Sequence, residues 1–259
     1  MSKVARLNKI FRSDGKAVVS VLDHASAMGP LEGIIDPRPA VEQIVAGGVD
    51  AIAASRGTAL HVCDLLNHVG MILRVDGGIT ALGNFGADMA LLYDVEDALR
   101  CGADGVISMG YVGEGEGPVL RYVAQLADEC EQWGVPFLAE MLPMVDGKRS
   151  SDAKHVAMAT RIGTEYGADF IKTVYTGDAE SFRQVTSSTF KPVLVLGGSK
   201  MDTDTAVLET VRGAIDGGGA GVAMGRNIWQ HKNPEKMTRA IVAIVHEDAS
   251  VEQAAKLLN

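Results

Sequence analysis

Lys172 is the residue whose type and position point most directly to chemistry. It lies inside the apolar run Asp169–Val174, where a charged side chain is costly to bury unless it is paired or functional. Burial disfavours the ammonium form, and a neutral amine can attack a carbonyl to form a Schiff base. Two interpretations stay open from position alone: a Schiff-base nucleophile, or a structural lysine that forms ion pairs with Asp23 or Glu140.

Asp23 and Glu140 are the acidic residues expected beside this lysine, because each lies near the end of another apolar run. Carboxylates in a water-poor site can move protons during carbinolamine formation and bond cleavage. The alternatives are structural. Asp23 could cap the loop that follows it, and Glu140 could form an ion pair with no chemical role.

Two glycine-bearing segments, Gly197-Gly198-Ser199 and Gly225-Arg226, are candidates for a phosphate site. Glycine allows the backbone to approach a ligand closely, and a guanidinium suits a dianion. Either segment could also be an ordinary turn. His24 is expected near the site, but the six histidines show no metal-ligand spacing, so we predict neither a metal nor a nucleotide cofactor.

The elements that must position these residues alternate along the whole chain. Short apolar runs, typical of strands buried on both faces, are separated by amphipathic helical segments such as Pro39–Ala46, Val95–Cys101, Pro118–Trp133, Ala153–Tyr166 and the terminal Val251–Leu258. The alternation predicts a (β/α)8 TIM barrel with residues 1–259 as a single domain, and the 259-residue length suits one such barrel. The expected strands are Ala17–Leu22, Val49–Ala54, Gly70–Val75, Gly105–Met109, Val135–Met141, Asp169–Val174, Pro192–Leu196 and Gly219–Met224.

The active site of this fold lies at the C-terminal ends of the strands, which is where all the candidate residues fall. A recurring phrase, as in Cys101-Gly-Ala-Asp104 and Tyr166-Gly-Ala-Asp169, is expected to end helices with a glycine cap before the next strand. Tyr111 is expected to border the site, and Glu114–Gly117 beside it to be a solvated loop.

Composition narrows the class of partner. The formal net charge of −9 argues against nucleic acid or an anionic membrane, which both require basic surface. It leaves an anionic small substrate open, since backbone N–H groups can build a local phosphate site. The N-terminal stretch has no apolar core of a secretory signal and no run is long enough to span a membrane, so a cytoplasmic enzyme is expected.

Several motifs resemble those of one family. Leu22–Pro30 resembles the first-strand sequence of the archaeal-type class I fructose-bisphosphate aldolases, and Phe170–Asp178 resembles their Schiff-base strand. Gly197–Lys200 and Gly225–His231 resemble their phosphate-binding ends. The resemblance covers most of the chain. The same family contains an aminodideoxyheptulosonate synthase and the thiolase that degrades phosphorylated autoinducer-2.

The resemblance implies a role for each matching position. Lys172 matches the Schiff-base lysine and Asp23 the acid of the first strand, while Gly198, Gly225 and Arg226 match phosphate-binding positions. Barrels of this family tend to form rings, so a homo-oligomer is expected.

The fifth strand departs from the fructose-bisphosphate pattern. Those enzymes place an acid/base Tyr before a Pro, whereas Leu142 precedes Pro143 here. The segment Pro136–Glu140 instead resembles the tagatose-bisphosphate and sulfofructose-phosphate type, in which a Glu carries the proton. The departure leaves the Schiff-base mechanism in place and the sugar open.

The function predicted from these observations is a metal-independent class I aldolase that reversibly cleaves a ketose phosphate into dihydroxyacetone phosphate and an aldehyde. Lys172 forms the iminium, Glu140 removes the hydroxyl proton and Asp23 assists imine formation and hydrolysis. One alternative keeps the lysine but performs thiolase or transaldolase-type transfer on a phosphorylated ketone. Another, of a different class, is a sugar-phosphate-binding barrel in which Lys172 is structural.

Overall fold

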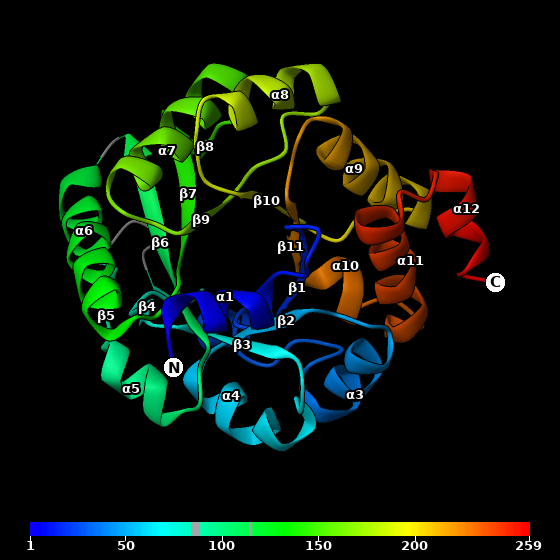
Figure 1. The fold of residues 1–259 in the computed structure, drawn as a ribbon, viewed down its shortest axis with the longest axis horizontal. Coiled ribbons are helices and arrows are strands. Elements are labelled where there is room, and N and C mark those ends of the chain that lie inside the picture. Colours follow the sequence, from blue (N-terminus) through cyan, green and yellow to red (C-terminus); the bar gives the residue numbers. More distant parts are fainter. Residues whose placement is uncertain (84–88, 114) are drawn as a thin grey trace.

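Eight parallel strands form a closed barrel in the computed structural model, which describes residues 1–83, 89–113 and 115–259 (Figure 1). The strand order is β6-β3-β2-β1-β11-β10-β9-β7, and pairing of β6 with β7 closes the ring. The predicted TIM barrel is therefore confirmed. Its strands are β1 (Ala17–Val21), β2 (Ala51–Ala54), β3 (Gly70–Arg74), β6 (Gly105–Gly113), β7 (Phe137–Val145), β9 (Phe170–Thr173), β10 (Val193–Leu196) and β11 (Gly221–Met224).

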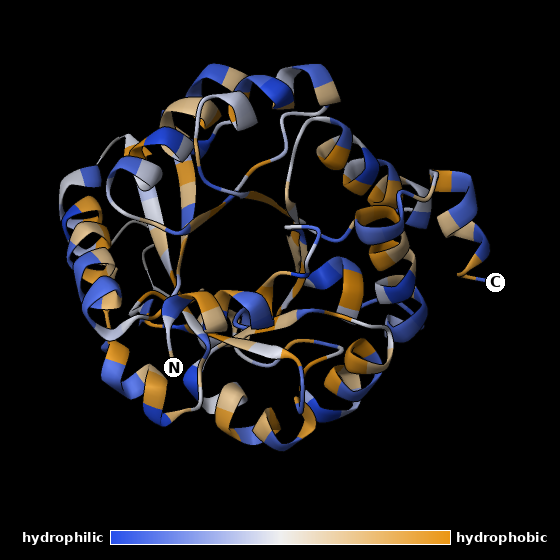
Figure 2. Cartoon of the chain, viewed as in Figure 1, coloured by the Kyte–Doolittle hydropathy of each residue, from blue (hydrophilic) through white to orange (hydrophobic). Residues whose placement is uncertain are grey.

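Helices surround the barrel, and each carries both hydrophobic and hydrophilic residues along its ribbon (Figure 2). The predicted helices are present as α3, α5, α6, α7 and α12, with ends shifted by one or two residues. In chain order the helices are α1 (Lys3–Ile10), α2 (Ala25–Met28), α3 (Arg38–Ala46), α4 (Arg56–Val62), the 3-10 turn η1 (Cys63–Leu65), α5 (Val95–Arg100), α6 (Glu116–Trp133), α7 (Ala153–Glu165), α8 (Ala179–Ser187), α9 (Asp204–Asp216), α10 (Arg226–Trp229), α11 (Pro234–Glu247) and α12 (Val251–Lys256).

The strands β6 and β7 extend four residues beyond their predicted ends. They stay in register from Val106 and Phe137 to Gly113 and Met144, because each satisfies the backbone groups of the other. Beyond them, β8 (Lys148–Arg149) pairs antiparallel with the end of β7, and β4 (Asp76–Gly77) pairs with β5 (Ala90–Leu91). This long pair of strands raises one wall on the C-terminal side of the barrel.

The segment Glu114–Gly117 was expected to be a loop, and this is wrong for its second half. Helix α6 begins at Glu116, and Gly115 before it has the left-handed φ of 74° that glycine adopts easily. The Glu116 carboxylate accepts a hydrogen bond of 2.6 Å from the backbone N–H of Gly113, which ties the helix to the end of β6. Glu114 lies outside the described residues.

The recurring glycine–aspartate motif between a helix and the next strand has a structural cause. A glycine with positive φ follows the C-cap of each preceding helix, as at Gly102 and Gly167. The aspartate that follows then accepts a hydrogen bond from a backbone N–H at the start of a neighbouring strand. The three cases are Val18 N to Asp50, Met71 N to Asp104 and Phe137 N to Asp169, at 2.6, 3.2 and 2.9 Å.

The interior of the barrel is filled by apolar side chains from alternate residues of the strands. Helix α1 packs against them from the N-terminal side, where the Phe11 and Phe170 rings meet edge to face at 5.1 Å. The interior residues, all fully or almost fully buried, include Val19, Val21, Ala53, Ile72, Ile107, Leu138, Phe170, Leu194 and Ala223. Within the described ranges, no helix combines the length and the apolar character needed to cross a bilayer.

Replacing Phe170 with Ala is expected to lower the free energy of unfolding by about 3–5 kcal/mol, because it removes a fully buried aromatic ring and leaves a cavity. Phe190→Ala is the matched control, since Phe190 is 66% exposed, and it should change stability by less than about 1 kcal/mol. Urea unfolding measures both. Equal losses in the two variants would contradict the packing described here.

Candidate active site

The charged residues inside the barrel are placed there by the same alternation of side chains that fills its interior with apolar residues. Successive strand residues point to opposite faces, so a residue two positions after an interior one also faces inward. Phe170 is followed in this way by Lys172, and Leu138 by Glu140. The interior therefore changes from an apolar layer to an ionic layer toward the C-terminal ends of the strands. Arg74 follows Ile72 and Asp23 follows Val21 in the same manner.

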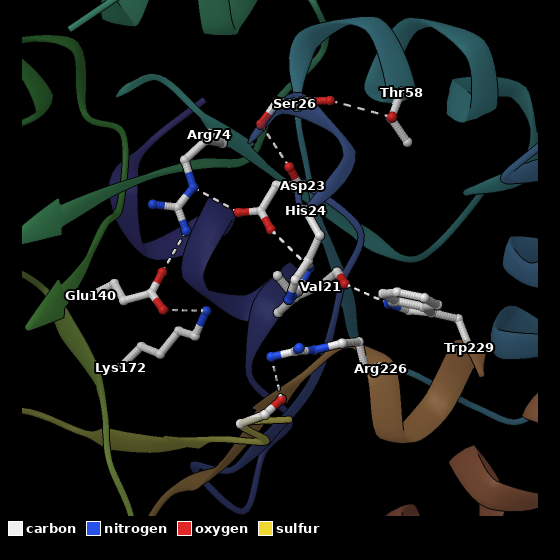
Figure 3. Close-up of polar contacts among 12 residues, drawn as sticks. Val21, Asp23, His24, Ser26, Thr58, Arg74, Glu140, Lys172, Arg226 and Trp229 are labelled. Atoms are coloured by element: carbon white, nitrogen blue, oxygen red, sulfur yellow. Dashed lines mark hydrogen bonds and ion pairs between the residues drawn. The ribbon is translucent and has the colours of Figure 1, made fainter. Parts of the chain in front are cut away.

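Lys172 and Glu140 are neighbours in the register of β9 and β7. The Lys172 Nζ lies 2.8 Å from Glu140 Oε1, and both side chains are buried. The other carboxylate oxygen of Glu140 accepts a hydrogen bond from Arg74 Nη2 (Figure 3). Burial by itself raises the pKa of Glu140, but the attraction of Lys172 and Arg74 outweighs it and lowers that pKa to about 2.

Arg74 joins this pair to the rest of the ionic layer. Its Nε donates to Asp23 Oδ2 at 2.6 Å and its Nη1 to Asp76 Oδ1 at 3.2 Å. Burial alone raises the pKa of Asp23, yet the charges of Arg74 and Lys172 bring it below the ordinary value. Asp23 is thus held ionised by the charges of Arg74 and Lys172.

The sequence analysis missed Arg74 and Asp76. The same reasoning that selected Lys172 could have found Arg74, because it also interrupts an apolar strand. Asp76 is hydrogen-bonded to β6 and α6. Its Oδ2 accepts hydrogen bonds from Met109 N at 2.8 Å and from the Tyr122 hydroxyl at 3.3 Å. Burial raises the pKa of Asp76 in spite of Arg74.

His24 lies between the ionic layer and α10. Its ring meets the Trp229 ring edge to face at 5.7 Å, and its Nδ1 is 3.4 Å from Asp23 Oδ1. Burial lowers the pKa of His24, and the attraction of Asp23 does not fully offset this. The imidazole is therefore neutral near pH 7. Trp229 is fixed in turn by a 2.9 Å hydrogen bond from its Nε1 to the carbonyl of Val21.

The two glycine-bearing segments come together at the ends of β10 and β11. Arg226 Nη2 donates to the carbonyl of Gly198 at 3.0 Å. The side-chain amide of Asn227, a residue that the sequence analysis did not select, donates to the carbonyls of Gly197 and Ser199 at 2.8 and 3.3 Å. These contacts hold one loop against the other.

The positive charge of Arg226 is available to an anionic ligand. No carboxylate lies within 4.0 Å of its guanidinium among the described residues, and its buried Nε has no hydrogen-bond partner there. Gly225 before it must remain a glycine, because a Cβ would lie 2.6 Å from the carbonyl of Val21. Gly198 has a φ of 65° and open space beside it.

A cleft of about 390 Å³ opens onto the ionic layer. Lys172, Glu140 and Asp23 line it, as do His24 and Arg74. The structure therefore brings the predicted catalytic residues into one site. Gly197, Gly198, Ser199, Gly225 and Arg226 do not line this cleft; they lie beside it, with Arg226 extended toward the side that holds Lys172 (Figure 3).

The cleft continues away from Arg226 toward β2, β3 and β6. Arg56 and Tyr93 line this part, with the Arg56 guanidinium 5.5 Å from the centre of the Tyr93 ring, and Tyr111 lines it as predicted. In the part of the chain that the structure describes, no three His, Cys, Asp or Glu side chains are grouped so as to hold a metal ion.

A barrel whose C-terminal cleft holds a buried lysine between carboxylates has the arrangement of an enzyme that uses an amine nucleophile. Comparison with known proteins specifies the family. A family model described as DeoC/LacD family aldolase matches residues 17–231. The chain belongs to this family of aldolases, and it is a class I aldolase.

Three similar proteins illustrate the relationship. The 2-amino-3,7-dideoxy-D-threo-hept-6-ulosonate synthase of Halobacterium salinarum is 37% identical over 97% of this chain and 94% of its own length. An archaeal fructose 1,6-bisphosphate aldolase has a TM-score of 0.86 at 29% identity, covering 95% of this chain and 100% of that one. A third, an archaeal fructose-1,6-bisphosphate aldolase whose catalytic lysine is covalently bound to the carbinolamine intermediate, has a TM-score of 0.86 at 28% identity, with 94% and 99% covered.

Replacing Arg74 with Met is expected to destabilise the fold by about 3–5 kcal/mol at neutral pH, because it leaves buried carboxylates without their cation. The lowered pKa values of Glu140 and Asp23 stabilise the wild type above about pH 4.5, and this contribution is lost as the pH falls toward about 2. The difference between variant and wild type should therefore shrink over that range. Urea unfolding across pH measures it.

Arg56→Met is the control for this prediction, because Arg56 also lines the cleft but is exposed and has no carboxylate within 4.0 Å among the described residues. Its effect on stability should stay below about 0.5 kcal/mol at every pH. A loss for Arg74→Met that does not vary with pH would mean that packing, rather than charge, explains it.

Proposed function

We propose that this aldolase acts on a phosphorylated ketose through a Schiff base on Lys172, releasing an aldehyde and dihydroxyacetone phosphate. The observation that carries the proposal is the 2.8 Å contact between Lys172 Nζ and Glu140 Oε1 in a cleft at the C-terminal ends of the strands. The contact alone would also suit a purely structural ion pair. Membership of an aldolase family favours the chemical role.

The first steps convert an amine into an iminium. The Lys172 ammonium releases a proton to water in the cleft, and its neutral amine attacks the ketone carbon to give a carbinolamine. Loss of water, which needs a proton donor near the carbinolamine hydroxyl, forms the iminium. Asp23, held close by Arg74, is proposed to assist this step and the reverse hydrolysis.

The negative charges of the site balance Lys172 both as the ammonium and as the iminium. An iminium carries the same positive charge as the ammonium it replaces, so Glu140 and Asp23 remain balanced after it forms. The iminium then accepts the electron pair of the breaking carbon–carbon bond and becomes a neutral enamine. The role predicted for Glu140, removal of the hydroxyl proton on the carbon that is released, stays a prediction, and it excludes any other residue as the acceptor of that proton.

The phosphate is proposed to bind at the loops after β10 and β11. Loops at this position form phosphate sites in many barrels of this type. Arg226 supplies a guanidinium without a carboxylate partner among the described residues, while Gly198 and Gly225 let the backbone approach closely. A phosphate held there places the adjacent ketone toward Lys172.

A second candidate function is aldol synthesis or transfer of the enamine to another acceptor. The 37% identity with the heptulosonate synthase favours it, since that protein is described as a synthase rather than a cleaving enzyme. Transfer to coenzyme A, as by a thiolase, is the further variant predicted from sequence. Product analysis by NMR, with and without an acceptor aldehyde or coenzyme A, separates the three reactions. A single domain and a cytoplasmic homo-oligomer also stay predictions.

Borohydride reduction in the presence of dihydroxyacetone phosphate is expected to leave a covalent adduct on Lys172 of the wild type, because the reductant traps the iminium. Lys172→Met should show no adduct and should lose aldolase turnover. Lys256→Met is the matched control, since Lys256 is an exposed lysine in the terminal helix α12, outside the cleft and the phosphate loops, and it should label like the wild type. Peptide mass spectrometry locates the adduct. A labelled Lys172→Met protein would contradict the proposal.

Arg226→Met is expected to raise the KM for dihydroxyacetone phosphate about 10-fold to 100-fold, because a charged hydrogen bond to the phosphate is lost. Unphosphorylated dihydroxyacetone is the matched substrate. Its turnover should change less than about threefold, since it has no group for Arg226 to bind. A similar loss with both substrates would show that Arg226 acts on the fold of the site instead of on the phosphate.

A further inference from the structure

Tyr111 lines the same cleft as Lys172, from β6, which is separated from the lysine's strand β9 by β7 alone. In the register of β6 and β7, Met109 pairs with Glu140, and Tyr111 pairs with Leu142. Gly110, between the two inward residues of β6, points outward, where a Cβ would meet Met141 Sδ. Tyr111 therefore lies one inward step, about 7 Å, closer to the C-terminal opening than the layer of Glu140 and Lys172.

The Tyr111 hydroxyl is available to a ligand. The side chain lines the same cleft as Lys172 and Glu140, and within the described ranges its hydroxyl forms no hydrogen bond. Burial raises the pKa of Tyr111, and the charges of Glu140 and Asp76 raise it further. The group is therefore a neutral phenol at physiological pH and holds a proton that it can donate.

The carboxylates of the site are already engaged with cations. Both oxygens of Glu140 are occupied by Lys172 and Arg74, and Asp23 is bound by Arg74. Their lowered pKa values make them weak proton acceptors. They are suited to balancing the positive charge of the iminium at Lys172. An aldol reaction also requires a group that donates a proton to the aldehyde oxygen during bond formation and accepts it during cleavage.

The other tyrosine of the cleft is placed differently. Tyr93 follows β5, and its ring faces the Arg56 guanidinium. His24 lies on the opposite side, against Trp229 and near the charge of Arg226, where the phosphate is proposed to bind. Tyr111 lines the cleft from β6, one inward step beyond the layer of Glu140.

We propose that Tyr111 is the proton donor to the aldehyde oxygen in bond formation and the proton acceptor in cleavage; this rests on the proposed Schiff-base function. The enamine carbon forms a bond to the carbonyl carbon while the C=O π pair moves to oxygen. That oxygen takes the phenolic proton, and the nitrogen on Lys172 returns to an iminium. The proton that left the dihydroxyacetone phosphate carbon when the enamine formed is carried by water in the cleft and returns to the phenolate, so no other reactant is consumed.

Tyr111→Phe tests this role because it removes only the hydroxyl. With dihydroxyacetone phosphate and the best acceptor from a panel of short aldehydes, kcat should fall about 10²-fold to 10³-fold and KM should change less than about threefold. The borohydride adduct on Lys172 should form as in the wild type. Tyr166→Phe is the control, because Tyr166 is an exposed tyrosine at the end of α7 that does not line the cleft, and it should keep kcat within about twofold.

Exchange of the dihydroxyacetone phosphate C3 proton in D2O separates the two halves of the reaction, since it requires the iminium and enamine but no carbon–carbon bond. Tyr111→Phe should retain this exchange within about threefold while losing condensation. Loss of both would show that Tyr111 only supports Lys172, and retention of both would leave the proton to another group; either result overturns the proposal. A wild type without a borohydride adduct would instead refute the Schiff-base function itself.

Discussion

The ion pairs of the buried Arg74 guanidinium are the interactions on which the ionic layer at the C-terminal end of the barrel depends. The guanidinium contacts Asp23, Asp76 and Glu140, three carboxylates that would otherwise repel one another out of reach of water. Lys172 supplies the second positive charge through Glu140. Three negative and two positive charges leave this layer with one net negative charge, so a cation at Lys172 is favoured both as the ammonium and as the iminium proposed to replace it.

The same alternation that builds the core also builds the site. On β1, β3, β7 and β9 the inward residue is apolar near α1 and the residue two positions later is charged, because the period of a strand returns every second side chain to the interior. The apolar layer keeps water from reaching the ionic layer from below. The paired strands β6 and β7 extend beyond the ionic layer toward the C-terminal opening of the barrel. They carry Tyr111, which lines the cleft.

The polar groups around Lys172 are divided into separate environments. Arg226, Gly198 and His24 lie on the side of β10 and β11, while Tyr111, Arg56 and Tyr93 lie on the side of β2, β3 and β6. A substrate with a phosphate at one end and an aldehyde carbon further along would span both sides with its ketone at the lysine. Binding, imine chemistry and carbon–carbon chemistry would then be carried by different residues.

The sequence by itself determined the eight strands and the helices α3, α5, α6, α7 and α12, because strand burial, helix amphipathicity and glycine caps are properties of short segments. It also selected Lys172, since a charge inside an apolar strand is visible without any partner. Only the tertiary structure decided that Arg74 links Asp23 to Glu140, that β6 and β7 extend together past Met109 and Met141, and that Tyr111 lies one inward step beyond Glu140. These features depend on registers and ion pairs between residues as many as 66 positions apart, which no local pattern encodes.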